Sequence, residues 1–525
     1  MKKPLLLGID LGSSSVKATL FSADCRPVKE ARRDNHPCQP RPGVAEYDAH
    51  RLFKATCAAI RQVMDEGRVR PGDVAAVCAD GMISGTMGID AEGEATTPYT
   101  TTLDMRFAPQ LNQVMDRWHD LIRLKTGSGQ PTIGPKMMWT RDAFPGAYRR
   151  TAKFVTITGY VAGQLAGLNA ESAFIDHTHL WASGLSDTQH FAWSPELCEA
   201  MGLPVGKLPR IVAATDIVGR LCRKAATATG LKEGTPVVAG AGDQSAAFVG
   251  AGLTRPGRMG DAAGTYPILS VCTSEFSPDL THRMAEIMPS PVPGLWNPCS
   301  IIIGGGLTHH WFGKMFGGAN ESKAGGTSGL PAVFARLDKE AGRLSPGSDK
   351  LFFNPHLGGQ ACPTRTYLKG AWMGFTWTHQ PAHFYRALLE AIAYDQSLAW
   401  QAMRSAYPQI KPREVVVYGG GARSHLWNQI KADVMGLPYV CCEREDLAAL
   451  GAVIIAGCAL GLYDNMAVAA ERSARHTRRF KPRARVHQFY RVYADLYRRL
   501  LEQTDACYQE LWALPEWAEA KRDGR

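Results

Sequence analysis

The first stretch of the chain alternates apolar residues with glycine and serine. Residues 4–22 have the pattern of an apolar strand, a turn rich in glycine and serine, and a second strand with alternating apolar positions. The pattern predicts a β-hairpin with a glycine-rich tip. Such a tip offers free N–H groups and hydroxyls to an anion, and Gly8 and Gly12 let the backbone come close to it.

Further strands and helices alternate through the first half of the chain. Apolar runs predict strands at residues 74–81, 152–159 and 235–242, and a helical pattern covers residues 49–67. Strands that alternate with helices are typical of an α/β layer architecture.

The second half begins with a pattern similar to the first hairpin. Residues 258–272 again predict strand, turn and strand, and the order aspartate, glycine, hydroxyl residue recurs at Asp261, Gly264 and Thr265. Such turns are common, so one echo is weak evidence for a duplication. Its position near the middle of the chain makes a duplication the better interpretation.

The remaining patterns of the second half indicate an insertion, a glycine-rich loop and a closing helix. Residues 315–348 are rich in glycine and serine and predict a mobile insertion, and residues 387–403 predict a buried helix. A strand runs through glycines 419–421 into a helix, which favours a nucleotide or phosphate site without the spacing of the dinucleotide fingerprint. The last helix has one predicted packing face, formed by Phe489, Tyr493, Leu496, Leu500 and Thr504.

Composition and charge narrow the class of protein. The chain has 525 residues, 45% of them hydrophobic and 21% charged, as expected of a soluble globular protein of two or three domains. No apolar run is long enough for a membrane helix or a signal peptide, and 13 cysteines without a regular spacing favour the reducing cytoplasm. We therefore expect a cytoplasmic protein with no membrane partner.

The net charge of +10 is compatible with an anionic ligand. Much of it lies in residues 472–485, which lack the interleaved aromatic residues of a nucleic-acid surface, so we expect a solvated linker and no nucleic-acid partner. His177 and His179, like the pair His309 and His310, lack cysteine or carboxylate partners at metal-ligand spacing and are expected to be loop or core residues.

A single carboxylate, Asp243, stands where the strand ending at residue 242 gives way to a helix of small residues. On its own, such an aspartate is most often a helix N-cap, because its oxygen accepts free N–H groups of the first turn.

Four segments in order resemble the FGGY family of carbohydrate kinases. "GIDLGSSSVKATLF" and "GDAAGTY" are similar to the two phosphate motifs of the family, "TPVVAGAGDQSAAFVGAG" to its catalytic segment, and "YGGGARSHLWNQIKADVMGLP" to its adenosine motif. Smaller segments are most similar to those of xylulokinases. The resemblance implies two actin-like (ribonuclease H-like) α/β domains with a catalytic cleft between them, residues 1–253 for the sugar and the base and residues 254–525 for the nucleotide, with ATP and Mg²⁺ as cofactors.

By this resemblance Asp243 is the general base that accepts the proton of the sugar hydroxyl. We expect the helix dipole to keep it ionised, so that it works without a raised pKa. Asp10 is implied to hold Mg²⁺ through water. The implied nucleotide-binding residues are Gly12, Ser13, Ser14, Lys17, Gly264, Thr265, Gly420, Gly421 and Asn428. For Lys17, a side chain pointing to solvent is the alternative.

The sugar site departs from the family pattern. Where xylulokinases commonly have Ser-Gly-Gln-Met-His-Gly, this chain has "DGMISG", so Ser84 stands in the place of a histidine and Met82 in that of a glutamine. Asp104 and Arg106 match a family segment without its tryptophan, and a surface ion pair is their alternative role. The implied sugar-binding residues are Met82, Ile83, Ser84, Asp104, Arg106, Asp243 and Gln244.

The resemblance therefore predicts phosphorylation of a ketopentose such as D-xylulose. A kinase of another sugar or polyol, of the ribulose, fuculose or erythritol type, is an open alternative. A non-catalytic ATP-binding switch is a second alternative, which the "GAGDQ" context of Asp243 argues against. Two phosphate hairpins on different domains predict closure of the cleft around the substrates. A homodimer is the default expectation for an assembly.

Overall fold

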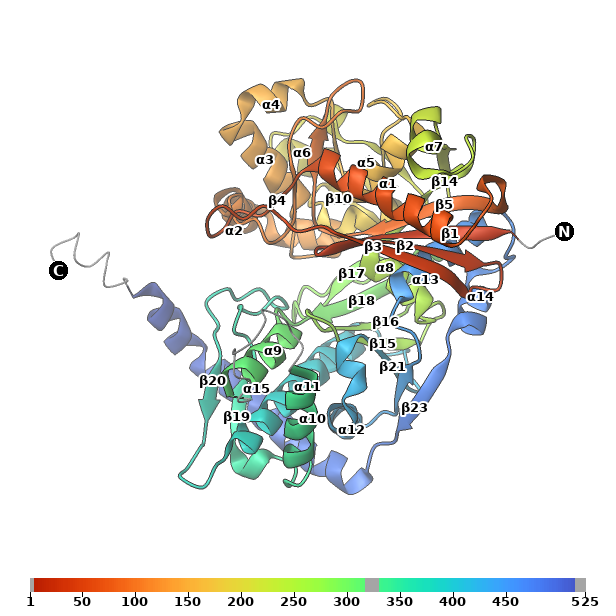
Figure 1. The fold of residues 1–525 in the computed structure, drawn as a ribbon. Coiled ribbons are helices and arrows are strands. Elements are labelled where there is room, and N and C mark those ends of the chain that lie inside the picture. Colours follow the sequence, from red (N-terminus) through yellow and green to blue (C-terminus); the bar gives the residue numbers. More distant parts are fainter. Residues whose placement is uncertain (1–3, 317–329, 515–525) are drawn as a thin grey trace.

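The structure of the protein is a computed structural model that describes residues 4–316 and 330–514. The chain forms two lobes, each built around a sheet, with the first half of the sequence in one lobe and most of the second half in the other (Figure 1).

The first sheet contains the predicted hairpin and the strand that leads to Asp243. Its strand order is β13-β14-β5-β1-β2-β3. The hairpin strands β1 and β2 pair antiparallel, while β5 lies parallel to β1 and to β14. The strands are β1 (Leu5–Leu11), β2 (Ser15–Ser22), β3 (Pro27–Asp34), β5 (Val74–Gly81), β13 (Ile217–Arg220) and β14 (Pro236–Gly242).

The second sheet repeats the pairing pattern of the first. Its order is β17-β18-β16-β15-β21-β22-β23. Read from β3, the first sheet has two antiparallel pairings, then two parallel pairings and one antiparallel pairing. Read from β17, the second sheet has the same sequence of pairings after one additional antiparallel pairing, that of β17 with β18. The strands are β15 (Met259–Ala262), β16 (Ile268–Val271), β17 (Glu286–Pro289), β18 (Trp296–Ile301), β21 (Val415–Tyr418), β22 (Tyr439–Cys442) and β23 (His476–Phe480). This recurrence confirms the strand-turn-strand restart expected at residues 258–272.

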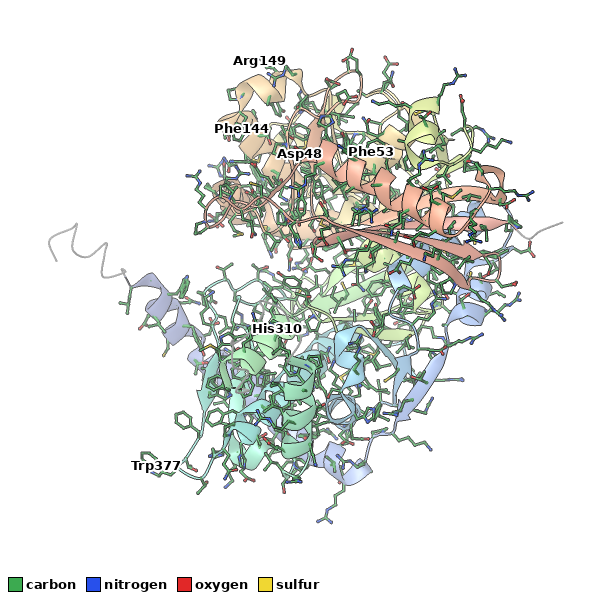
Figure 2. All side chains as sticks on the ribbon, viewed as in Figure 1. Asp48, Phe53, Phe144, Arg149, His310 and Trp377 are labelled. Carbon is green, nitrogen blue, oxygen red and sulfur yellow. The ribbon has the colours of Figure 1, made fainter. Side chains whose placement is uncertain are left out.

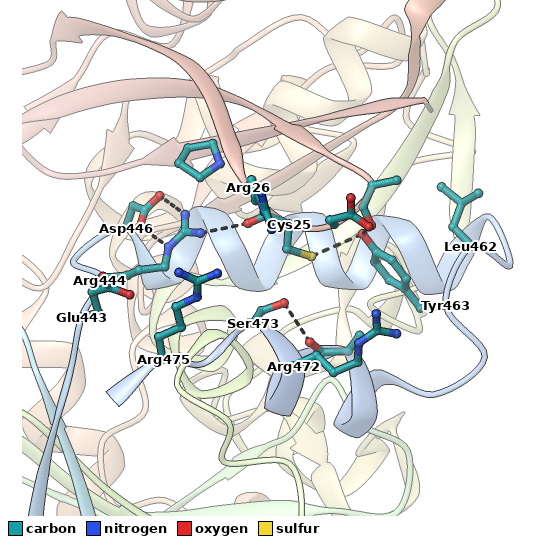
Figure 3. A pocket seen from close by; sticks show the side chains of 14 residues that line it. Cys25, Arg26, Glu443, Arg444, Asp446, Leu462, Tyr463, Arg472, Ser473 and Arg475 are labelled. Atoms are coloured by element: carbon teal, nitrogen blue, oxygen red, sulfur yellow. Dashed lines mark hydrogen bonds and ion pairs between the residues drawn. The ribbon is translucent and has the colours of Figure 1, made fainter. Parts of the chain in front are cut away.

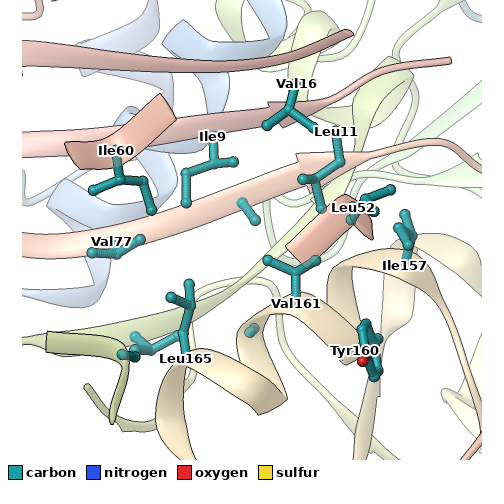
Figure 4. Packing of buried hydrophobic residues seen from close by; sticks show 14 of the residues in the cluster. Ile9, Leu11, Val16, Leu52, Ile60, Val77, Ile157, Tyr160, Val161 and Leu165 are labelled. Atoms are coloured by element: carbon teal, nitrogen blue, oxygen red, sulfur yellow. The ribbon is translucent and has the colours of Figure 1, made fainter. Parts of the chain in front are cut away.

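Helices cover the sheets. In the first lobe α1 and α5 pack on one face of the sheet, where Ile9, Ile60, Val77, Val161 and Leu165 form part of one buried core (Figure 4). The helices of this lobe are α1 (Ala49–Glu66), α2 (Ala108–Thr126), α3 (Ile133–Ala143), α4 (Pro145–Arg150), α5 (Ile157–Ala166), α6 (Pro195–Ala200), α7 (Arg223–Thr229) and α8 (Asp243–Gly250). The later helices are α9 (Gly305–Phe316), α10 (Leu330–Ala341), α11 (Pro381–Ala406), α12 (His425–Met435), α13 (Leu447–Ala459), α14 (Met466–Ser473) and α15 (Ala484–Ala513).

Two helices about 200 residues apart in the sequence, α8 and α13, join the lobes. α13 also packs on β1 and β5, so one apolar core contains residues of both halves of the chain. The two helices cross so closely at Gly451 that a β-carbon on this residue would lie 1.9 Å from the carbonyl oxygen of Ala246. Only glycine fits at that crossing.

Short strands and turns connect the main elements. Trp377, in the loop between β20 and α11, is fully exposed and projects from the lower end of the second lobe, away from both sheets (Figure 2). The additional strands are β4 (Glu46–Tyr47), β6 (Met87–Ile89), β7 (Tyr99–Thr100), β8 (Lys153–Val155), β9 (Phe174–Asp176), β10 (Ser186–Asp187), β11 (Ala192–Trp193), β12 (Arg210–Val212), β19 (Phe352–Asn354) and β20 (Ala371–Met373). Across the described ranges, every helix is too short or too polar to span a bilayer.

Two predicted segments are folded differently from expectation. The strand expected at residues 152–159 ends at Val155, because Thr156 caps α5 by accepting a hydrogen bond from the amide of Gly159. The expected insertion at 315–348 contains α10, whose Leu330, Leu337 and Ala341 are buried. Its residues 317–329 lie outside the described part of the chain.

The closing helix and the basic segment also differ from the prediction. In α15 the fully buried positions are Tyr490, Ala494, Tyr497 and Leu501. Of the predicted face, Tyr493, Leu496 and Leu500 are partly buried and pack on the same core, whereas Phe489 is 42% exposed. The hydroxyl of Tyr490 donates to buried Glu390, which fixes the rotation of α15. The basic segment is not a linker: it contains the edge strand β23, where Arg479 contacts Glu414 at 2.6 Å.

Candidate active site

Carboxylates lie at the ends of three adjacent strands of the first sheet. Asp10 on β1 is the register partner of Asp80 on β5, and Gly242 at the end of β14 pairs with Gly81. Asp243 follows directly and begins α8. Parallel strands therefore bring three acidic side chains, far apart in sequence, to one edge of the sheet.

Asp10 lies at the open end of the first hairpin. Its Oδ2 is 3.2 Å from the Nζ of Lys17, its partner on β2, and its side chain is 18% exposed. Beyond it, the amide of Gly12 donates to the carbonyl of Ser15 and closes the turn. Ser13 is exposed at the tip, so its hydroxyl is open to a ligand, while the ammonium of Lys17 is paired with Asp10.

Asp243 is the first residue of α8 rather than its N-cap. The N-cap is Gly242, and Oδ1 of Asp243 accepts a hydrogen bond from the amide of the next residue, Gln244, at 2.7 Å. Burial and the charge of Asp10 raise the pKa of Asp243 to about 7, against the opposing effects of the Gln244 amide and of His179. The expectation that Asp243 needs no raised pKa is therefore wrong, because loss of solvent outweighs the helix dipole here.

Asp80 is a third acidic residue that the sequence did not single out. Its side chain is fully buried, and neither carboxyl oxygen has a hydrogen-bond partner among the described residues. Burial, together with the charges of Asp10 and Asp243, raises its pKa well above the usual range. The available signal was a charged residue inside the otherwise apolar strand "VAAVCADG".

The second hairpin, formed by β15 and β16, has free space around its turn. A β-carbon on Gly264 would meet no atom within 4 Å, and Thr265 is exposed. The carbonyl of Thr265 accepts a hydrogen bond from the amide of Gly306, at 3.1 Å. Gly306 belongs to a glycine run, 304–306, at the start of α9. Sequence reasoning missed this run, although three glycines before a helix are the same signal as at 419–421.

In the segment similar to the adenosine motif, the backbone has free space beside Gly420 but is tightly packed at Gly421. Gly420 faces free space, whereas a β-carbon on Gly421 would lie 2.8 Å from the β-carbon of Ala263. Asn428 is fully buried, and its Nδ2 donates to the carbonyls of Ala422 and Ser424, so it shapes the loop.

Asp261 repeats the sequence position of Asp10 but not its environment. It is completely buried and pairs with Lys431 at 2.6 Å, and it also accepts a hydrogen bond from Gln396. The second hairpin therefore has its carboxylate neutralised inside the fold, and only the first hairpin keeps an accessible one.

The predicted sugar residues 82–84 line the strand end beside Asp243. Met82 is buried, and Ile83 packs so closely on Gly242 that a β-carbon there would lie 2.5 Å from it. Ser84 has a φ of 66°, and its carbonyl accepts a hydrogen bond from the Nζ of Lys136 at 2.9 Å. Burial lowers the pKa of Lys136 to about 7, against the effect of Asp104.

Three other predicted sugar residues are bonded to protein groups. Arg106 donates hydrogen bonds to both carboxyl oxygens of buried Asp104, pairs with Glu46 and lies over the ring of Trp139. Gln244 donates its Nε2 to the hydroxyl of Tyr418, 2.9 Å away in the other lobe. The bonding of Asp104 to Arg106 agrees with the ion-pair alternative, although the pair is not on the surface.

A cavity of about 1000 Å³ lies apart from these carboxylates, between the β2–β3 turn, the segments on either side of α13, and α14 (Figure 3). Its charged lining residues are Asp24, Arg26, Glu443, Arg444, Asp446, Arg472 and Arg475. Arg444 is already bound to Asp446 and to the carbonyl of Cys25. None of the predicted site residues lines this cavity.

No cluster of three or more histidine, cysteine, aspartate or glutamate residues with metal-binding geometry occurs among residues 4–316 and 330–514. His177 and His179 are buried in the short 3₁₀-helix η2 (His177–Ala182), as core residues.

The chain is similar to known sugar kinases over nearly its whole length. The chain is 24% identical to a xylulose kinase of Bacillus subtilis, over 95% of this chain and 97% of the relative. It is 27% identical to an autoinducer-2 kinase of Escherichia coli K12, over 94% and 93%.

The fold is also similar to solved structures. A xylulose kinase and a gluconate kinase from Lactobacillus acidophilus superpose with TM-scores of 0.86 and 0.85, each at 20% identity, covering 97% of this chain and all of the other. This supports the two-domain fold of actin-like sugar kinases.

Residues 5–250 match the N-terminal domain of the FGGY family of carbohydrate kinases, and residues 283–460 match the C-terminal domain of that family. The chain belongs to the FGGY family of carbohydrate kinases.

Proposed function

We propose that this carbohydrate kinase transfers the γ-phosphoryl group of ATP to a hydroxyl of a ketopentose, of which D-xylulose is the first candidate, with Asp243 as general base. In this step Asp243 takes the hydroxyl proton, the sugar oxygen bonds to the γ-phosphorus, and the bond from that phosphorus to the β–γ bridging oxygen breaks to release ADP. The observation that carries the proposal is the position of Asp243 at the end of β14, beside the hairpin that holds Asp10. Its raised pKa matches it to proton transfer near neutral pH.

The nucleotide is proposed to lie between the two hairpins and the glycine loop of the second lobe. Gly264 and Gly420 leave space beside their backbones, and Ser13 and Thr265 are exposed at the two tips. Free N–H groups and hydroxyls at such turns suit phosphate oxygens. We propose Gly12, Ser14, Lys17 and Gly421 as further members of this site, with Asn428 acting through the shape of the loop.

Asp10 is proposed to hold Mg²⁺. One of its carboxyl oxygens faces Lys17 and the other lies on the side of Gly12, and the side chain is partly exposed, so a hard oxygen ligand is available. Bound there with the phosphates, Mg²⁺ would neutralise charge that develops during phosphoryl transfer.

Another sugar or polyol is the second candidate substrate. It is favoured by Asp80 and Ser84, which stand where xylulokinases commonly have serine and histidine, and by the relatives that are autoinducer-2 kinases. We propose Met82, Ile83 and Ser84 as the sugar-facing segment, with Asp104, Arg106 and Gln244 behind it in supporting bonds. A homodimer and a cytoplasmic location stay predictions of the sequence.

The test is ADP release with Mg-ATP across ketopentoses, aldopentoses, deoxy sugars, linear polyols and aldonates. We expect one substrate class to raise ADP release far above the rate without sugar. Nucleotide binding without sugar-dependent release for any of them would favour the ATP-binding switch.

A further inference from the structure

The end of β9 and the 3₁₀-helix η2, which contact the turn before Asp243, contain a buried group of polar side chains with no assigned role. Asp176, Thr178 and His179 are each at most 1% exposed and lie at the end of β9 and in η2. Asp176 accepts hydrogen bonds from the amide and the hydroxyl of Thr178 and contacts Nδ1 of His179 at 2.7 Å. Buried polar groups are costly unless bonded, so this cluster needs an explanation.

The cluster is bonded to the turn that carries the proposed base. The hydroxyl oxygen of Thr178 accepts a hydrogen bond from the amide of Gly242, at 2.9 Å. Gly242 directly precedes Asp243, and the hydroxyl of Thr178 in turn donates to Asp176. Two consecutive bonds therefore connect Asp176 to the residue before Asp243.

His179 approaches the same turn from its other ring nitrogen. Nε2 has no hydrogen-bond partner among the described residues, and a β-carbon built on Gly242 would lie 3.6 Å from it. Burial raises the pKa of Asp176, but the charge of His179, together with the hydrogen bonds from His179 and Thr178, outweighs it and lowers that pKa. Nδ1 is therefore bonded to Asp176, and the other ring nitrogen, Nε2, is held against the Gly242–Asp243 turn.

We propose that Thr178 and His179, both held by Asp176, are positioning residues for Asp243: Thr178 fixes the backbone of Gly242, and Nε2 of His179 is a polar group held in a fixed place against the same turn. The cluster acts through Asp243 and does not touch the sugar. This inference rests on the proposed role of Asp243 as general base.

A positioning role makes a specific demand on the kinetics. Proton transfer depends on placement of the carboxylate to within about half an ångström, whereas nucleotide binding uses other residues. Loss of the cluster is therefore expected to lower kcat, with little change in KM for ATP. Substitution of a residue that merely stabilises the fold would lower the melting temperature but would not lower kcat while leaving KM for ATP unchanged.

The variants separate the two bonds. Thr178→Val removes the hydroxyl at constant volume, and Thr178→Ser returns it. His179→Asn keeps an amide N–H for Asp176 but removes Nε2. The matched control is His190→Asn, because His190 makes the same contact to Asp187, at 2.8 Å, on the protein surface.

With the sugar that gives the strongest signal, we expect Thr178→Val and His179→Asn to lower kcat by roughly tenfold to a hundredfold, with KM for ATP changed by less than about threefold. Thr178→Ser is expected to restore most of the loss, and His190→Asn to match the wild type.

If both variants keep the wild-type kcat while remaining folded, or if Thr178→Ser is as slow as Thr178→Val, the positioning role is overturned and the proposed function stands. If one variant does not fold, the other decides by the same criteria. If the wild type phosphorylates no sugar, the proposed function fails and the positioning role fails with it.

Discussion

Asp10 and Asp80 are register partners on the adjacent parallel strands β1 and β5, and only Asp10 has a cationic partner, Lys17. Asp80 is enclosed by protein with both oxygens unbonded. An acidic side chain in this position opposes folding and is not explained by packing.

Asp80→Ser is therefore expected to stabilise the protein at pH 8. The folded-state pKa of Asp80 is raised, so its cost is absent below the unfolded pKa of about 4 and grows as the pH rises above it. We expect a gain of roughly 1–3 kcal/mol at pH 8 in urea unfolding, and a smaller gain at pH 4. The exposed residue Glu92, changed to serine, is the control. Equal stability of wild type and Asp80→Ser at both pH values would contradict the assignment of Asp80 as a buried, unpaired acid.

Gly264→Ala tests whether the phosphates of the nucleotide bind beside the second hairpin. A methyl group at this position meets no protein atom within 4 Å, so the melting temperature should not change. If the phosphates bind there, KM for ATP should rise by about tenfold or more, because a tenfold weaker binding corresponds to a loss of about 1.4 kcal/mol of binding free energy. Gly206→Ala is the matched control, because its β-carbon also meets no protein atom. An unchanged KM would show that the nucleotide does not approach Gly264.

The fold was predicted from the sequence where a local pattern decides the structure. The hairpin at residues 4–22, the strand before Asp243 and the glycine loop at 419–421 follow from apolar alternation and turn residues. Where distant partners decide, the prediction was incomplete: Tyr493, Leu496 and Leu500 of α15 pack on the core as expected, but the deepest positions lie one residue later, where Tyr490 donates a hydrogen bond to Glu390.

The site was predicted less completely than the fold. The position of Asp243 beside Asp10 follows from the motifs, but its pKa depends on burial that a sequence does not display. His179 has a spacing of three residues from Asp176, as His190 has from Asp187. Only the fold makes the first pair buried and the second exposed, so the sequence did not distinguish them.

Domain closure stays a prediction. The packing of α8 against α13 and the buried ion pair between Arg123 and Glu286 already connect the lobes. We expect sugar together with a non-hydrolysable ATP analogue to reduce the radius of gyration measured by small-angle X-ray scattering, because closure excludes water from the phosphoryl group. Sugar alone and nucleotide alone serve as controls. Identical scattering in all states would rule closure out.

The pH dependence of the reaction should report Asp243. Burial and the charge of Asp10 raise its pKa to about 7, and a general base works only when it is unprotonated. We expect kcat/KM for the sugar to rise with pH through a midpoint near 7 and then level off, and added positive charge from Mg²⁺ to move that midpoint lower. A profile that is flat from about pH 5 to pH 9 would show that Asp243 does not titrate in the reaction.

The most direct test of the account is the Asp243→Asn variant, assayed for sugar-dependent ADP release with the substrate that the panel identifies. Asparagine keeps the size of the side chain and the backbone turn but cannot take the hydroxyl proton. We expect kcat to fall by about a hundredfold or more while the dissociation constant for ATP stays within about threefold of the wild type. A variant that phosphorylates the sugar as fast as the wild type would contradict the assignment of Asp243 as the base.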